Sequence, residues 1–130
     1  MRARLPRLPR TLALCLRFAL ALPCADHALA AERSPVTSIK PLLVAAIDNG
    51  EAHGELVGEA AKFMRERFKS IAPIVIDVKT LATLNEPGCK RLEVTTRQEG
   101  IIEAAKQSPA HKELVYQVSY CRDGRFPDTK

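Results

Sequence analysis

Cys89 and Cys121 are the residues whose type and spacing most clearly specify chemistry, because each marks an extended stretch of alternating residues, 88–96 and 114–121. If the two stretches pair antiparallel with the cysteines opposite each other, paired residue numbers add to 210. This alignment places mostly apolar residues opposite one another on one face of the hairpin: Leu92 with Val118, Val94 with Tyr116, and Thr96 with Leu114. Such a ladder sets register in a half-buried sheet. The cysteines and the apolar pattern therefore predict the same disulfide-linked hairpin.

An alternative role for the two cysteines is metal binding together with His53 and His111. Zinc ligands usually come in close pairs such as Cys-x2-Cys, whereas these four residues are scattered singly. A redox-active role would need a Cys-x-x-Cys motif, which the sequence lacks. We therefore expect a structural disulfide, with no metal ion and no cofactor.

The segment that most resembles a site contains Asn49, Glu51, His53 and Glu55, interspersed with glycines. A histidine flanked by acids can titrate near neutral pH or bind a metal ion. One hypothesis is a small hydrolase or metal-binding enzyme that uses His53 with Glu51 or Glu55. The alternative is a loop that leads into a helix, with His53 at its solvated edge and without a role of its own. No phosphate loop, dinucleotide fingerprint or nucleophile elbow accompanies the segment, so we expect no catalytic residue.

Gly50, Gly54 and Gly58 recur every four residues. Small residues at this spacing allow helices to approach closely, which suggests a contact with a soluble partner. The alternative is a loosely formed helix start, because each glycine costs about 1 kcal/mol inside a helix.

Residues 1–30 are typical of a secretory signal peptide. Four arginines precede an apolar run at residues 12–22, which is shorter than the roughly 20 residues that a bilayer span needs. Residues 28–30 (Ala-Leu-Ala) match a cleavage site, so we expect a mature chain that begins at Ala31 in the periplasm or outside the cell. A lipoprotein anchored through Cys24 is disfavoured, because Pro23 stands where lipoprotein processing prefers a small residue.

Export changes how the charge and the cysteine count are interpreted. The whole chain has a net charge of +5, and five arginines with Asp26 give residues 1–30 a charge of +4, which leaves +1 for the rest. The sequence therefore gives no reason to expect nucleic-acid binding, and membrane contact is expected only transiently, through the signal peptide. Cys15 and Cys24 are lost with the leader, so one cysteine pair remains, as expected of an oxidising compartment.

The mature chain is expected to have a flexible N-terminus at residues 31–38 and a single small domain at residues 39–130. Residues 39–47 are apolar on all sides and fit either a buried strand or a short helix; we favour the strand. An amphipathic helix is expected to begin between Glu51 and Glu55 and to end before Pro73. Its apolar residues repeat at helical spacing: Leu56, Val57, Ala60, Ala61, Met64, Phe68 and Ile71.

Residues 74–79 alternate in polarity with period two, as in a half-covered strand. The predicted fold class is α+β, with two layers: one amphipathic helix on a mostly antiparallel sheet of three or four strands that includes the disulfide-linked hairpin. The apolar stripe of the helix would cover Leu92, Val94, Tyr116 and Val118. Strand alternation places the disulfide on the opposite, polar face, where it would brace the sheet from outside; a bulge at Gly88 would move it inward instead.

Three stretches, residues 52–58 (AHGELVG), 87–94 (PGCKRLEV) and 120–124 (YCRDG), are similar to small exported proteins of unknown activity that are encoded within bacterial integrating conjugative elements. The resemblance implies an accessory role in conjugative transfer or secretion at the cell envelope, and it transfers no catalytic residue. The function expected from the sequence is thus a non-enzymatic periplasmic accessory protein that contacts a protein partner. An inhibitor or immunity-type protein is a further alternative.

Overall fold

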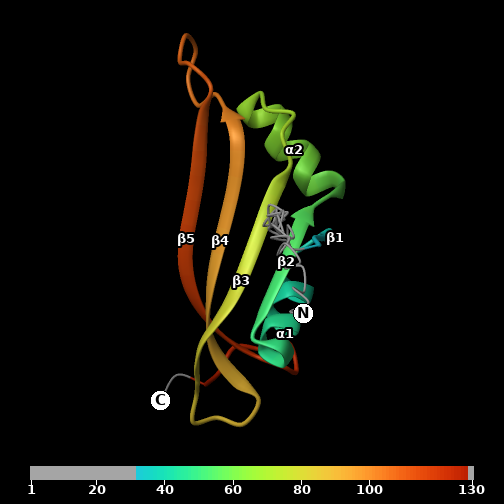
Figure 1. Ribbon diagram of the computed structural model, residues 1–130, viewed down its shortest axis with the longest axis vertical. Helices are drawn as coiled ribbons and strands as arrows, with labels where there is room; N and C mark the ends of the chain where they lie inside the picture. The colour runs from blue at the N-terminus through green and yellow to red at the C-terminus, as the bar shows by residue number, and fades with distance from the viewer. Residues whose placement is uncertain (1–31, 129–130) are drawn as a thin grey trace, which may run out of the picture.

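The computed structural model describes residues 32–128, so the expected signal peptide, its cleavage site and Cys24 lie outside the described residues. The described chain forms these elements in order: β1 (Ser34–Val36), α1 (Lys40–Asn49), β2 (Glu51–Leu56), α2 (Gly58–Phe68), β3 (Ile74–Thr83), β4 (Cys89–Ile101) and β5 (Ala110–Cys121). The strands make one sheet in chain order, β1-β2-β3-β4-β5 (Figure 1). β1 and β2 run parallel because α1 carries the chain back between them, and the other neighbours run antiparallel.

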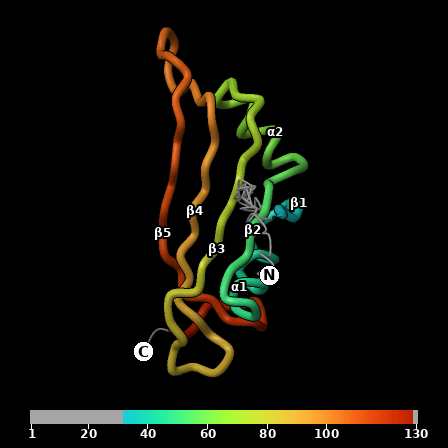
Figure 2. The backbone as a smooth tube through the Cα atoms, in the orientation of Figure 1, coloured from blue at the N-terminus to red at the C-terminus, as the bar shows by residue number. Residues whose placement is uncertain are grey.

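The predicted register of the hairpin is confirmed. Cys89 pairs with Cys121, and the pairing continues without interruption as far as Gln98 opposite Lys112. The pairs deduced from the sequence all occur: Leu92 with Val118, Val94 with Tyr116, and Thr96 with Leu114. The tube drawing shows β4 and β5 side by side along their whole length, joined by the loop at residues 102–109 (Figure 2).

The core lies between α1 and one face of the sheet. Leu42, Leu43, Ala46 and Ile47 of α1 are buried in one cluster with apolar residues from β2 to β5: Ala52, Ile76, Val78, Leu92, Val94 and Tyr120. Along β3, Ile74, Ile76 and Val78 are buried while their neighbours are partly exposed, which confirms the predicted alternation.

The preference for a strand at residues 39–47 was wrong, because these residues belong to α1. Pro41 occupies the first helical turn, where its missing N–H costs nothing. Gly50 follows the helix with a φ of +91°, a conformation that glycine adopts without steric cost. Apolar residues occupy both the buried positions of α1 and the half-buried positions Val44 and Ala45, so the sequence of this short helix shows no helical periodicity.

The predicted position of the main helix was also wrong. Residues 51–56 form β2, and the helix begins only at Gly58, because β1 and β3 flank residues 51–56 on both sides and supply ladder hydrogen bonds. Within α2 only Ala61 is buried, whereas Phe63 and Ile71 are 65% and 97% exposed. The face that includes Leu92 and Val94 is therefore covered by α1.

The predicted numbers of strands and helices, and the predicted flexible N-terminus, also differ from the structure. The α+β class and the disulfide are confirmed, but the sheet has five strands and the described chain has two helices. Part of the N-terminus expected to be flexible, Ser34–Val36, is a strand with Val36 buried in the core. The row of small residues is likewise not a helical one: Gly54 lies on β2 beneath Leu42 of α1 and lets that helix approach the sheet.

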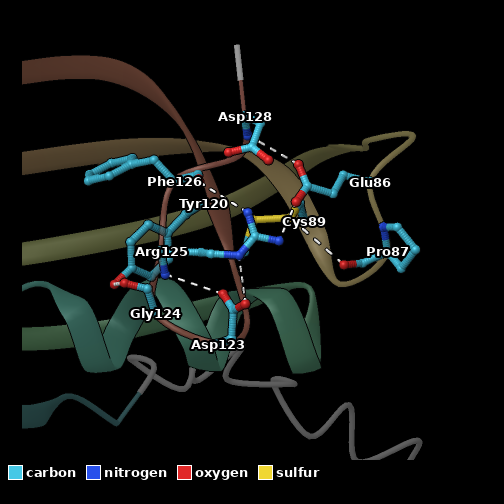
Figure 3. Close-up of a disulfide and its surroundings, with 10 residues drawn as sticks. Glu86, Pro87, Cys89, Tyr120, Asp123, Gly124, Arg125, Phe126 and Asp128 are labelled. Carbon is cyan, nitrogen blue, oxygen red and sulfur yellow. Dashed lines mark hydrogen bonds and ion pairs between the residues drawn. A yellow bond between two sulfur atoms is a disulfide. The ribbon is translucent and has the colours of Figure 1, made fainter. Parts of the chain in front are cut away.

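The disulfide between Cys89 and Cys121 is formed, and both residues are fully buried. It does not belong to the core cluster under α1, in agreement with the alternation that places it on the other face. The turn after β5 shields it: Arg122 N donates to Gly88 O at 2.9 Å, and Arg125 pairs with Glu86 beside the sulfur atoms (Figure 3). The hydrogen bond from Arg125 holds the pKa of Glu86 below its ordinary value.

Replacing both cysteines with alanine is expected to lower the free energy of unfolding by roughly 3 to 4 kcal/mol, because the crosslink closes a loop of 32 residues in the unfolded chain. The melting temperature should fall by roughly 10 to 20 °C in circular dichroism under oxidising conditions. Mass spectrometry of the wild type should find two hydrogens fewer than the reduced chain. Two free thiols, or an unchanged melting temperature in the variant, would contradict the assignment.

Gly54→Ala is expected to destabilise the protein by about 1 to 3 kcal/mol, since its methyl group would lie 2.6 Å from Cδ1 of Leu42. The specific test is a double-mutant cycle by urea unfolding with Leu42→Ala, which removes the clashing atoms. The double variant should be more stable than the sum of the single changes predicts, by about 1 kcal/mol or more. Additive effects would show that Gly54 does not act through its contact with α1.

Candidate functional site

Asp77 is the centre of a charged cluster on the face of the sheet opposite α1. His53 lies directly across from it on β2 and Thr95 on β4, so neighbouring strands direct their side chains to one place. His53 Nδ1 and Arg33 Nη1 each lie 2.7 Å from Asp77 Oδ1, and Arg97 Nη2 pairs with Asp77 Oδ2. Arg33 immediately precedes β1, so the cluster ties together the first four strands of the sheet.

The environment of Asp77 favours its charged form. Partial burial by itself would raise the pKa, but hydrogen bonds from Arg33 and His53 and the charges of Arg33 and Arg97 hold the pKa of Asp77 below its ordinary value. The side chain is 21% exposed, so these interactions are only partly screened by water.

A shallow depression of about 230 Å³ lies over this cluster. Its lining includes two of the residues singled out in the sequence, Glu51 and His53, whose side chains approach to 3.8 Å. The other lining residues are Asp77, Val78, Lys79, Glu93, Thr95 and Arg97. The two remaining candidates lie elsewhere: Asn49 ends α1, and Glu55 faces Arg65 of α2 at 3.9 Å. The segment expected to be a loop is a strand, which is why Glu51, His53 and Glu55 share one face of the sheet.

The pair formed by His53 and Asp77 has the geometry of a catalytic base and the acid that orients it. Among the described residues, however, no hydroxyl or thiol is hydrogen-bonded to His53, and both oxygens of Asp77 are engaged by arginines. The one group of potential metal ligands found within residues 32–128 is Glu86 with the two cysteines, whose sulfurs are bonded to each other. The cluster is thus best suited to holding strands together.

Sequence reasoning missed Asp77, although a signal existed. An acid in the middle of the run Ile-Val-Ile-Asp-Val must either face solvent or find cationic partners. Its partners are 20, 24 and 44 residues away in sequence, so no local pattern could identify them.

A second surface of interest is the outer edge of β5, the last strand of the sheet. From Ala110 to Gln117 every residue of β5 is exposed, including three large apolar ones: Leu114 at 62%, Val115 at 49% and Tyr116 at 40%. No other described strand pairs with this edge. It is the longest exposed stretch of strand in the described chain.

Beside this edge, a groove of about 340 Å³ runs between α2 and the adjoining ends of β4 and β5. Its apolar lining comes from Met64, Phe68, Ile74, Ile101 and Leu114. Gln98 also lines it and is only 5% exposed; its Nε2 donates to Ala72 O at 3.2 Å, while its Oε1 has no hydrogen-bond partner among residues 32–128.

Comparison with known proteins gives no matching family model, no matching curated protein and no matching solved structure. Within the described residues, no helix has the length and apolar character required to cross a membrane. The assignment of a function therefore rests on the geometry of this chain and on the resemblance noted in its sequence.

Asp77→Asn is expected to lower the free energy of unfolding at pH 7 by about 1 to 3 kcal/mol, because it removes the charge that three partners share. Since the pKa of Asp77 is lowered in the folded state, its stabilisation is complete above an unfolded pKa of about 4 and is lost as the pH falls through the folded value. The difference between wild type and variant in urea unfolding should therefore shrink below about pH 4.

His53→Ala is the matched control for Asp77→Asn, because it removes one partner and leaves both arginines in place. It should preserve the fold and cost less stability than Asp77→Asn. A stability difference for Asp77→Asn that stays constant from pH 7 to about pH 2 would show that the charge of Asp77 is not what stabilises the cluster.

Proposed function

We propose that this protein is a small exported accessory protein without enzymatic activity, and that it binds another polypeptide chain along the free edge of β5. The observation that carries the proposal is the unpaired, exposed edge from Ala110 to Gln117. Edge strands accept an extended segment of a partner by main-chain hydrogen bonds, with side-chain contacts giving specificity.

The geometry of the hairpin shows which backbone groups are available. The Cα atoms of Cys89 and Cys121 are 3.9 Å apart, which marks a narrow, non-hydrogen-bonded pair. The N–H and C=O groups of Cys121 therefore point away from β4, and Cys121 N indeed donates to Arg125 O at 2.9 Å on the outer side. Because the register is continuous, Glu113, Val115, Gln117 and Ser119 also direct their main-chain groups outward.

The two edges of the sheet differ in a way that supports this role. Proteins usually blunt edge strands with proline, charge or short length. β1 has three residues and contains Pro35, whereas β5 has twelve residues and no proline. Between Glu113 and Tyr120 of β5 there is no charged side chain. An edge that is this long and uncharged is suited to pairing.

The remaining features fit a role outside the cytoplasm. A buried disulfide stabilises the hairpin that presents the edge, as is common in small exported domains. The resemblance to exported proteins of conjugative elements suggests that the protein acts in a conjugation or secretion apparatus. An inhibitor or immunity-type protein would use the same edge, and the identity of the partner would distinguish the two.

The test is site-specific photo-crosslinking in cells that export the protein. A benzophenone amino acid at Leu114 or Tyr116 should give covalent adducts, because both side chains lie on the exposed edge strand. Ile71, which is 97% exposed and lies in the turn after α2, is the matched apolar control and should give none. Equal labelling from Ile71, or no adduct from either β5 position, would contradict the proposal.

A further inference from the structure

The available edge of β5 has a definite extent and a definite centre. At its C-terminal end the outward N–H of Cys121 is already bonded to Arg125 O, so Ser119 is the last free position. At the other end β5 begins at Ala110. The register shift between Gln98 and Ile101 places the extra residue in β4, so the alternation of β5 itself makes His111 its first outward position. The outward positions thus run from residue 111 to residue 119, and Val115 is their midpoint.

Because its outward positions are arranged evenly about Val115, the edge of β5 can pair with the same edge of a second copy about a two-fold axis. If two copies of β5 run antiparallel with full overlap, residue numbers across the junction add to 230, and Val115 lies opposite Val115 of the other copy. The sum is even, so outward-facing odd residues meet one another and form the hydrogen-bonded pairs. Each side chain also stays on its own face of the joined sheet, because opposite residues share parity.

The same alignment is favourable for the side chains. On the face that carries α1, Leu114 lies opposite Tyr116 of the other copy, and this contact occurs twice. These are the two most exposed large apolar residues of that face of β5. On the other face Glu113 lies opposite Gln117, so no like charges meet. Full overlap of the edge therefore also brings exposed apolar side chains of the two copies together.

Neighbouring registers shorten the overlap. A sum of 228 places Leu114 opposite Leu114 and leaves Ser119 unpaired, while a sum of 232 places Tyr116 opposite Tyr116 and leaves His111 unpaired. Apolar residues meet in all three registers, and in each of them Lys112 lies opposite an apolar residue or a tyrosine. The number of main-chain groups that are paired is therefore what favours the sum of 230. A two-fold pairing is closed, and the short β1 edge with Pro35 does not extend it further.

We infer that the chain bound along the edge of β5 is a second copy of this protein, paired antiparallel about a two-fold axis at Val115. This inference rests on the proposed edge-strand function. The two sheets become one continuous sheet, with α1 of both copies on the same side. The dimer covers the exposed apolar residues of β5 and satisfies the outward main-chain groups of both copies.

The first test uses the protein purified in the form that the cell exports. Sedimentation equilibrium should show a dimer. Val115→Pro removes one outward N–H without breaking a bond to β4, and it should weaken dimerisation by about tenfold or more. Leu114→Lys, at a position that is 62% exposed in one copy, should do the same without affecting the fold. Ile71→Ser is the control and should leave the dimer unchanged; circular dichroism checks that each variant is folded.

The second test measures the register. A mixture of Leu114→Cys and Tyr116→Cys variants should form an intermolecular disulfide faster than either variant alone, because residues 114 and 116 meet in a narrow pair, as Cys89 and Cys121 do within one copy. A dimer without this preference, or one that is insensitive to Val115→Pro and Leu114→Lys, would overturn the inference.

The outcome also separates this inference from the proposed function. A wild type that stays monomeric at about 100 μM overturns the dimer, and so does coverage of the edge by another segment of the same chain. If Leu114 and Tyr116 then give photo-adducts with a different protein, the edge-strand function stands and only its occupant is wrong. If neither a dimer nor an adduct forms, both proposals fail.

Discussion

The pairing of Cys89 with Cys121 is the constraint on which the rest of the structure depends. It fixes one end of the β4–β5 register, and the regular alternation of the two strands transmits this choice over ten residue pairs up to Lys112. Because β3 holds β4 in place, a shift of β5 by one residue would turn Val118 and Tyr120 away from α1 and expose the core, so the covalent bond and the hydrophobic effect enforce the same alignment. Because the pair is narrow, the same bond also decides which main-chain groups of β5 face outward.

The two faces of the sheet are stabilised by different physics. On one face α1 buries apolar residues from β2 to β5. On the other, Asp77 gathers Arg33, His53 and Arg97 from the segments of β1, β2 and β4. A partly buried carboxylate with two guanidinium partners favours stability over reactivity, since its charge is already neutralised. The histidine that attracted attention in the sequence is therefore one contributor to an electrostatic clamp.

The sheet is asymmetric along its width, and this asymmetry points to its use. β1 is short, contains a proline and is covered in part by α1 through the burial of Val36. β5 is long, uncharged over most of its length and exposed on both faces. The disulfide and its covering turn, where Tyr120 meets Phe126 edge to face, make one end of this strand rigid. A rigid strand loses little conformational entropy on pairing, which favours association along the edge.

The sequence by itself determined the hairpin of β4 and β5, its register, its disulfide and the alternation of β3. Each of these features depends on residues that are adjacent in sequence or directly paired, and the spacing of apolar residues is a local signal. Only the tertiary structure decided that residues 51–56 are a strand and that residues 40–49 are a helix. Leu56 belongs to the apolar spacing that predicted a helix, yet neighbouring strands on both sides of Glu51–Leu56 supply hydrogen bonds that outweigh this preference. The Asp77 cluster and the free edge of β5 also arise only on folding, because they depend on residues that are brought together from distant parts of the chain, and on the absence of a sixth described strand beyond β5.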